Sequence, residues 1–182
     1  MKKYELTAES IVKFGRTLFR IKALVAFGDV KEGELGGFVE KEENLDQSGA
    51  AWVSGDAQVS GDARVFGDAQ VSGDARVSGA AWVFGDARVS GDAQIFKTSH
   101  YLVVGPLGSR DDFTTFFRTK HLTIGVKCGC FRGDIDQFFE AVEKTHGNNK
   151  YARAYRAAIA LAKLQIDLDE EDSDEEETGK ES

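Results

Sequence analysis

The chain has 182 residues, of which 41% are hydrophobic, one is proline and 20 are glycine; this composition suits a folded protein with many turns and excludes a low-complexity chain. The net charge of −8 arises at one end. Residues 167–182 carry ten acidic residues and one lysine, and the remainder has 22 basic against 21 acidic residues. A body so evenly charged lacks the basic footprint of a nucleic-acid-binding protein.

We expect neither a signal peptide nor a transmembrane anchor in this sequence. No run approaches the roughly 20 apolar residues of a membrane span, and no apolar stretch follows the first lysines. The two cysteines, Cys128 and Cys130, stand too close together to clamp a loop, which suits a reducing compartment. We therefore expect a cytoplasmic protein with no membrane contact.

The first segment, residues 1–34, is predicted to be a β cap. Residues 17–24 alternate as a strand does and could pair with residues 10–14. Residues 27–45 read as an irregular first coil. The cap would shield the open edge of the repeats that follow.

A six-residue repeat dominates the middle of the chain. From Gln47 it reads QSGAAW, VSGDAQ, VSGDAR, VFGDAQ, VSGDAR, VSGAAW, VFGDAR, VSGDAQ, IFKTSH. An aliphatic residue recurs every six positions from Val53 to Ile95, and an alanine precedes each of them by two. Residues two apart share one face of a strand, so alanine and valine point inward together. The Gly-Asp pair between them is a turn, since glycine accepts positive φ and aspartate can bond its own backbone.

Each hexad thus forms one side of an 18-residue triangular coil, and nine hexads form three coils, about the minimum for a stable repeat array. Hexads such as Val-Ser-Gly-Asp-Ala-Gln resemble those of the hexapeptide-repeat family over about residues 35–102. This resemblance implies a left-handed parallel β-helix, often trimeric, in a family with many acyltransferases. The segments GRTLFRIKAL, FGDVKEGELGGFVEKEENL and the GDARV array also resemble a prophage and enterobacterial group of YdcK-like transferases.

Stacking every 18 residues sorts the outward side chains onto three faces. The first face presents positions 52/54, 70/72 and 88/90, the second 58/60, 76/78 and 94/96, and the third 64/66, 82/84 and 100/102. Two faces are largely polar. The third face carries Arg64, Phe66, Trp82, Phe84 and Leu102. It is the predicted interface, since contiguous apolar patches of this kind are rarely left exposed to solvent. Three occupants are open: the C-terminal module, a second copy of the chain, or another protein.

Residues 103–166 are predicted to form a small α+β module. Strands are expected at 113–118 and 121–127, followed by a helix capped by Asp134 with Gln137 and ended by Gly147, and by a second helix over about 149–166. So small a module is marginally stable alone, which favours docking on the solenoid. The acidic residues 167–182 have the composition of a disordered tail that could contact a basic partner.

Candidate catalytic and metal-binding residues are few. His100 is the only histidine of the nine hexads and the candidate base if the chain is an acyltransferase. Cys128 and Cys130, with His121 and His146, could ligate zinc, but one Cys-x-Cys is a weak signal, and small residues at a strand end explain it as well. We expect no metal and no cofactor.

A glycine-rich segment, Gly105-Pro-Leu-Gly-Ser-Arg110, lacks the Gly-Lys-Ser/Thr ending of a phosphate-binding P-loop. Ser109 and Arg110, with Arg132, could still hold a phosphate or nucleotide, although a plain β-turn explains the glycines.

Three functions remain open at this point. The leading one is a non-catalytic binding or scaffold protein, plausibly phage-derived, that engages a protein partner, a second copy or a small ligand. The alternatives are an acyltransferase-like enzyme acting on a small molecule, and a nucleotide or phosphate binder. The fold class is mainly β: a solenoid of about three to four coils with a small α+β module and a disordered tail.

Overall fold

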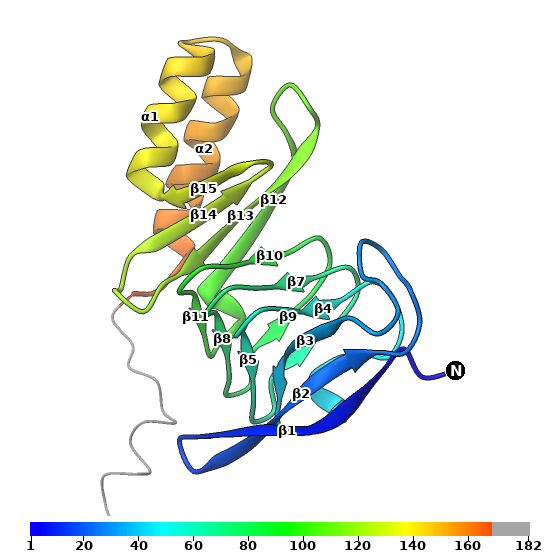
Figure 1. Cartoon of the computed structure of the whole chain (residues 1–182). Coiled ribbons are helices and arrows are strands. Elements are labelled where there is room, and N and C mark those ends of the chain that lie inside the picture. The colour runs from blue at the N-terminus through cyan, green and yellow to red at the C-terminus, as the bar shows by residue number, and fades with distance from the viewer. Residues whose placement is uncertain (169–182) are drawn as a thin grey trace, which may run out of the picture.

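Residues 1–168 are described by the computed structural model, in which a β-solenoid lies between an N-terminal hairpin and a C-terminal α+β module (Figure 1). The tail predicted for residues 167–182 lies outside the described residues except for its first two positions. The mainly β fold class, with its solenoid and its two helices near the C-terminus, is confirmed.

The solenoid consists of two-residue strands spaced six residues apart. They are β4 (Trp52–Val53), β5 (Gln58–Val59), β6 (Arg64–Val65), β7 (Gln70–Val71), β8 (Arg76–Val77), β9 (Trp82–Val83), β10 (Arg88–Val89) and β11 (Gln94–Ile95). Each pairs in parallel with the strand 18 residues away, as Val53 does with Val71 and Val71 with Val89. The resulting sheets, β4-β7-β10, β5-β8-β11 and β6-β9, are the three predicted faces.

The core of the solenoid is narrow and built from small side chains. The alanine of every hexad and the valine two positions later have no exposed surface. Glycine is required at the turns between strands: Gly73 has φ of +72°, and a Cβ there would lie 3.0 Å from the backbone nitrogen of Gly91 in the next coil. Inward packing and glycine turns together fix the distance between coils.

The N-terminal hairpin extends one solenoid face. Strands β1 (Tyr4–Lys13) and β2 (Arg16–Ala23) are antiparallel, β2 pairs antiparallel with β3 (Leu35–Val39), and β3 pairs in parallel with β5. The predicted strands are confirmed: β1 is longer than the segment expected at residues 10–14, and β2 is shifted by one residue from the expected 17–24. A short 3-10 helix, η1 (Glu42–Asn44), completes the first coil.

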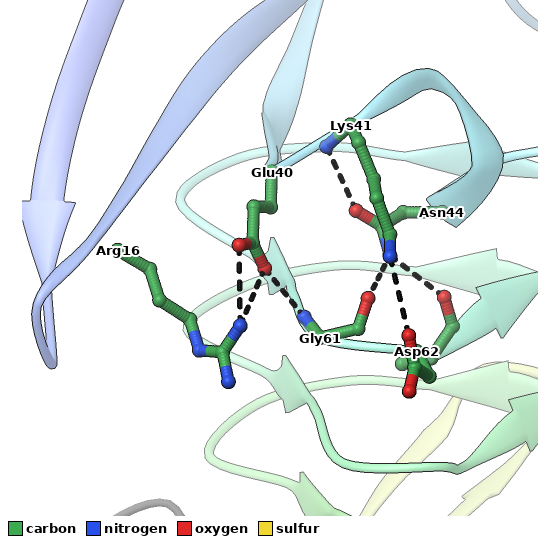
Figure 2. A network of polar contacts seen from close by, with 7 residues as sticks. Arg16, Glu40, Lys41, Asn44, Gly61 and Asp62 are labelled. Carbon is green, nitrogen blue, oxygen red and sulfur yellow. Dashed lines mark hydrogen bonds and ion pairs between the residues drawn. The ribbon is translucent and has the colours of Figure 1, made fainter.

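Side chains of this region satisfy the backbone at the first edge of the coils (Figure 2). The buried Asn44 amide donates to the carbonyls of Gly61 and Ala63, at 3.1 and 2.8 Å. Glu40 accepts the Gly61 N–H at 2.6 Å and the Arg16 guanidinium at 3.1 Å. These groups replace the partners that a preceding coil would supply, which explains why the array can start here.

A buried lysine lies beneath the same cap. Lys3 is 4% exposed, and its Nζ donates to the carbonyls of Ser48 and Ala51 at 3.2 and 2.9 Å. Burial lowers the pKa of Lys3 to about 8, against an opposing contribution from Asp46. Next to it, the Tyr4 hydroxyl donates to the Leu45 carbonyl at 2.7 Å.

The C-terminal module follows the last coil without a linker. After a short 3-10 helix, η2 (Thr98–His100), come β12 (Tyr101–Leu107), β13 (Asp112–Arg118), β14 (Ile124–Cys128) and β15 (Phe131–Asp134), all paired antiparallel in that order. Helices α1 (Ile135–His146) and α2 (Lys150–Gln165) then pack on this sheet.

The predicted helices of the module are confirmed in detail. The Asp134 side chain accepts from the N–H groups of Asp136 and Gln137. The Gln137 side chain in turn accepts from the Asp134 N–H, and Gly147 ends α1. One prediction was wrong: residues 121–123 form a turn, because Leu122 adopts a φ of +57°, and the strand starts at Ile124. Strand β15 was not predicted, because four residues are too few for a periodic signal.

Strand β13 connects the two hydrophobic cores. Phe116 belongs to the core under the helices, while its neighbour Phe117 completes the core of the solenoid. Thr115 accepts the Arg88 N–H at 3.0 Å, and the Lys120 N–H donates to the Asp92 carbonyl at 3.0 Å. The sheet therefore covers the last coil, and the helices stand on its other side (Figure 1).

We expect Val71→Asp to lower the free energy of unfolding by more than about 4 kcal/mol, because it buries a charge in a core with no polar partner. Ser72→Asp, one position along and partly exposed, is the matched control and should cost less than about 1 kcal/mol. Urea denaturation measures both, and equal stabilities would disprove the inward assignment of Val71.

The buried lysine predicts an unusual pH dependence. Between pH 8 and 10.5 the unfolded chain holds the Lys3 proton more firmly than the folded chain, so stability from this group rises with pH. The unfolding free energy of the wild type minus that of Lys3→Met should therefore increase by about 1–3 kcal/mol over this range. A flat or falling difference would contradict the burial of Lys3.

Candidate functional site

Four outward side chains of the third face form a compact group, which we call the aromatic strip: Arg64, Phe66, Trp82 and Phe84. They lie on and just after β6 and β9. The rings of Phe66 and Phe84 are stacked, with centroids 5.2 Å apart and planes 12° from parallel. Trp82 meets Phe66 edge-on at 6.0 Å, and Tyr101 meets Phe84 edge-on at 6.4 Å.

The aromatic strip is open to solvent in the single chain. Trp82 is 48% exposed and Phe84 is 44% exposed. The C-terminal module docks on β10 and β11 at the end of the solenoid, and Tyr101 of this module contacts Phe84 while leaving it and Trp82 about half exposed. Leu102, predicted to continue the strip, instead packs against the core of the module.

The two tryptophans show that this exposure is specific to the strip. Both follow Ala-Ala in otherwise similar hexads, yet Trp52 is 2% exposed. The N-terminal cap covers Trp52 with Tyr4 and Phe27, whose ring centroids lie 6.4 and 5.4 Å away. Within residues 1–168, no element covers Trp82 in the same way.

A second candidate site is a cavity of about 310 Å³ within the module, which we call the module cavity. It lies between the β12–β13 loop, the β14–β15 turn and α1. Ser109 and Arg110 from the glycine-rich segment line it, together with Cys128, Cys130 and His146. Five residues chosen separately from the sequence are therefore brought to one place.

Aromatic rings form the apolar wall of the module cavity. Phe138 packs against Phe131 and Tyr155, with centroids 5.1 and 5.4 Å apart, and His146 stacks on Tyr155 at 5.9 Å. Burial raises the pKa of Tyr155 to about 12, with Cys128 and Asp112 adding to the rise and Arg110 opposing it. The Tyr155 hydroxyl therefore stays protonated at neutral pH.

Arg132 does not join this group. It lines a different cavity, of about 250 Å³, between the module sheet and Ser90 and Asp92 of the last coil. The arrangement predicted for a phosphate, with Arg110 and Arg132 beside one loop, is thus split between two cavities.

The candidate base is buried. His100 has no exposed surface, and its ring lies edge-on against Phe96 at 4.2 Å. Arg118 lies over the same Phe96 ring at 4.7 Å. His121 is exposed and lies 3.4 Å from Asp92. No substrate can reach His100 in this conformation, because its side chain has no exposed surface.

Residues 1–168 contain no cluster of metal ligands and no helix fit to span a membrane. No group of three or more histidine, cysteine or acidic side chains in this range is placed to hold a metal ion, and Cys128 contacts Thr114 and Tyr155 instead. No helix in this range is long and apolar enough to cross a membrane.

Sequence reasoning missed several residues of both sites. Tyr101 lies one position before Leu102 of the predicted third face. Only the end of the hexad pattern after Ile95 could have shown that the chain leaves its coil there. Asp112, Phe131 and Tyr155 reach the module cavity through strand order and helix packing, for which no short-range signal exists.

The glycine-rich loop is held against Tyr155, which gives a stability test. Gly108 has φ of +77°, and a Cβ there would lie 2.0 Å from the Tyr155 hydroxyl oxygen. We expect Gly108→Ala to destabilise the protein by about 2–4 kcal/mol, combining backbone strain and overlap. Thermal denaturation measures the loss.

Gly129→Ala is the matched control, because Gly129 also has positive φ but its Cβ would find only Asp112 Oδ2, at 3.8 Å. It should show the backbone strain alone, about 1 kcal/mol. Tyr155→Phe should recover part of the Gly108→Ala loss. Equal losses at the two glycines would show that the loop does not press on Tyr155.

Comparison with known proteins agrees with the repeat geometry. The profile of the family described as YdcK Beta solenoid repeat matches residues 57–69 and 69–84, which span β5 to β9 and the aromatic strip. No curated protein matches the chain significantly. With the 18-residue parallel register and the buried Ala-x-Val hexads, this match shows that residues 57–84 carry repeats of the YdcK β-solenoid type.

Proposed function

We propose that this protein is a non-catalytic binding or scaffold protein that associates with a second copy of itself through the aromatic strip. The observation that carries the proposal is the exposure of Trp82 and Phe84 beside the stacked Phe66. Burying side chains of this size is worth about 1.5–3 kcal/mol each, and contiguous apolar patches usually mark contact surfaces.

Within the solenoid, the three sides are the surfaces left for association. The N-terminal hairpin and the Asn44 network occupy the first edge of the coils, and β13 occupies the last. Stacking of coils end to end between subunits is therefore blocked. Of the three sides, the first and second present mainly Gln, Arg and Ser, so the aromatic strip is the apolar one.

The strip is complementary to itself. Arg64 and Trp82 occupy the same strand position on adjacent coils, as do Phe66 and Phe84. A two-fold axis parallel to the strands would place Arg64 opposite Trp82 of the partner subunit and Phe66 opposite the partner's Phe84. Such a pairing stacks phenylalanines and sets a guanidinium against an indole, an attractive cation–π contact. Arg64 is the charged residue among the four, so its charge meets a ring rather than a like charge.

The acyltransferase alternative gains no support from its predicted base. It requires a base beside the coils, and His100, the histidine of the array, is buried against Phe96. The small-ligand alternative draws on a different part of the molecule, the module cavity.

The test is the oligomeric state of a double variant. Wild-type protein should behave as a dimer in size exclusion with light scattering, and Phe66→Ser with Phe84→Ser should shift it to monomer while its circular-dichroism spectrum is retained. Because Phe84 is only 44% exposed before association, the four phenylalanines of a dimer together contribute about 3–6 kcal/mol, enough to weaken dimerisation at least about a hundredfold when they are removed.

Ser54→Ala with Ser72→Ala, at the equivalent positions of the first face, is the matched control and should remain dimeric. A monomeric wild type would refute self-association. A trimer, the state implied by family resemblance, would refute the two-fold pairing. An assembly that survives the phenylalanine changes would place the contact elsewhere.

A further inference from the structure

We propose that the module cavity binds a small zwitterion with an apolar side group, of the chemical class of the aromatic and large aliphatic amino acids. The proposal is independent of the self-association proposed above, because the cavity lies in the C-terminal module and shares no residue with the aromatic strip.

The size and lining of the cavity suit such a ligand. A volume of about 310 Å³ lies at the lower end of small-molecule sites, which combine an apolar wall with a few polar groups. The wall here consists of Phe131, Phe138 and Val142, and the two phenylalanine rings are tilted 50° to one another. A phenyl or branched aliphatic group could pack on this wall.

The charged residues that line the cavity determine which charged groups the ligand should carry. Arg110 and Asp112 both line the cavity, and both act on the Tyr155 hydroxyl. Within residues 1–168 neither takes part in a salt bridge, although Asp112 accepts the Phe113 N–H through Oδ1 at 2.8 Å. A purely anionic ligand would meet Asp112, and a purely cationic one would meet Arg110. A ligand carrying both charges satisfies each residue, the carboxylate by the guanidinium fork and the ammonium by Asp112.

Neutral donors and acceptors complete the rim. Tyr155 and Ser109 line the cavity together with Arg110, as does Thr145, which precedes His146 on α1. These groups can bond a carboxylate or an ammonium without adding charge.

The experiment is an NMR titration of the full chain, uniformly ¹⁵N-labelled, with L-phenylalanine to about 10 mM, which fills about 90% of a site with a Kd of 1 mM. The expected result is saturable shifts at residues 109–112, 128–131 and 138–146. 3-Phenylpropionate, which lacks the ammonium, and phenethylamine, which lacks the carboxylate, should each bind at least about tenfold more weakly.

Variants assign the roles. Arg110→Gln and Asp112→Asn should each weaken phenylalanine binding at least about tenfold, and Asn can still accept the Phe113 N–H. Ala141→Phe, which fills the cavity and changes no charge, should abolish binding. Arg132→Gln, in the other cavity, is the matched control and should bind as the wild type does.

Three results would overturn the proposal: no saturable shifts with either phenylalanine or leucine, shifts confined to other parts of the chain, or a single-charge probe that binds as tightly as phenylalanine. Because the Phe66→Ser, Phe84→Ser variant keeps the cavity, it should bind phenylalanine unchanged, so failure of self-association and failure of this site are distinguishable.

Discussion

The structure depends on one packing constraint, the stacking of small inward side chains every 18 residues. Ala-x-Val hexads fill a core too narrow for a large or charged residue, and the positive-φ glycines keep adjacent coils in contact. Nothing in such a core can bind or react. Any function must therefore reside in the outward side chains, at the two ends of the coils, or in the modules attached there.

The two ends are closed in different ways, with different consequences. At the first edge, a hairpin continues the sheet, and side-chain amide and carboxylate groups replace the missing coil. At the last edge, β13 crosses the coil and contributes Phe117 to the solenoid and Phe116 to the core below the helices. Sharing one strand between two cores ties the small module to the solenoid, which supports a unit that would be only marginally stable alone at its size.

Much of the fold could be predicted, because the same sequence pattern recurs in every hexad. Each hexad independently specifies an inward alanine and valine and a glycine turn. The 18-residue register and the three faces could therefore be predicted over the whole range from Val53 to Ile95. The cap of α1 followed from Asp134 and Gln137 because capping is local. The turn at Leu122 did not, since a leucine at positive φ has no sequence signature.

The sites were predictable only in part, for the same reason. The aromatic strip followed from the repeat, but whether the module covers it depended on where β13 docks, which is a tertiary contact. Ser109, Arg110, Cys128 and His146 could be chosen by residue type, yet their meeting in one cavity required the strand order of the module. Arg132, equally plausible by type, points to another cavity for that reason alone.

The central claim is that the aromatic strip is buried between copies of the chain, and Trp82 reports on it directly. Trp52 is already buried, so changes in tryptophan emission with protein concentration arise at Trp82. Self-association through the strip predicts that, as protein is concentrated across the range of dimer formation, emission shifts to the blue and acrylamide quenching falls by about half. Emission and quenching that stay constant while light scattering shows association would contradict the claim.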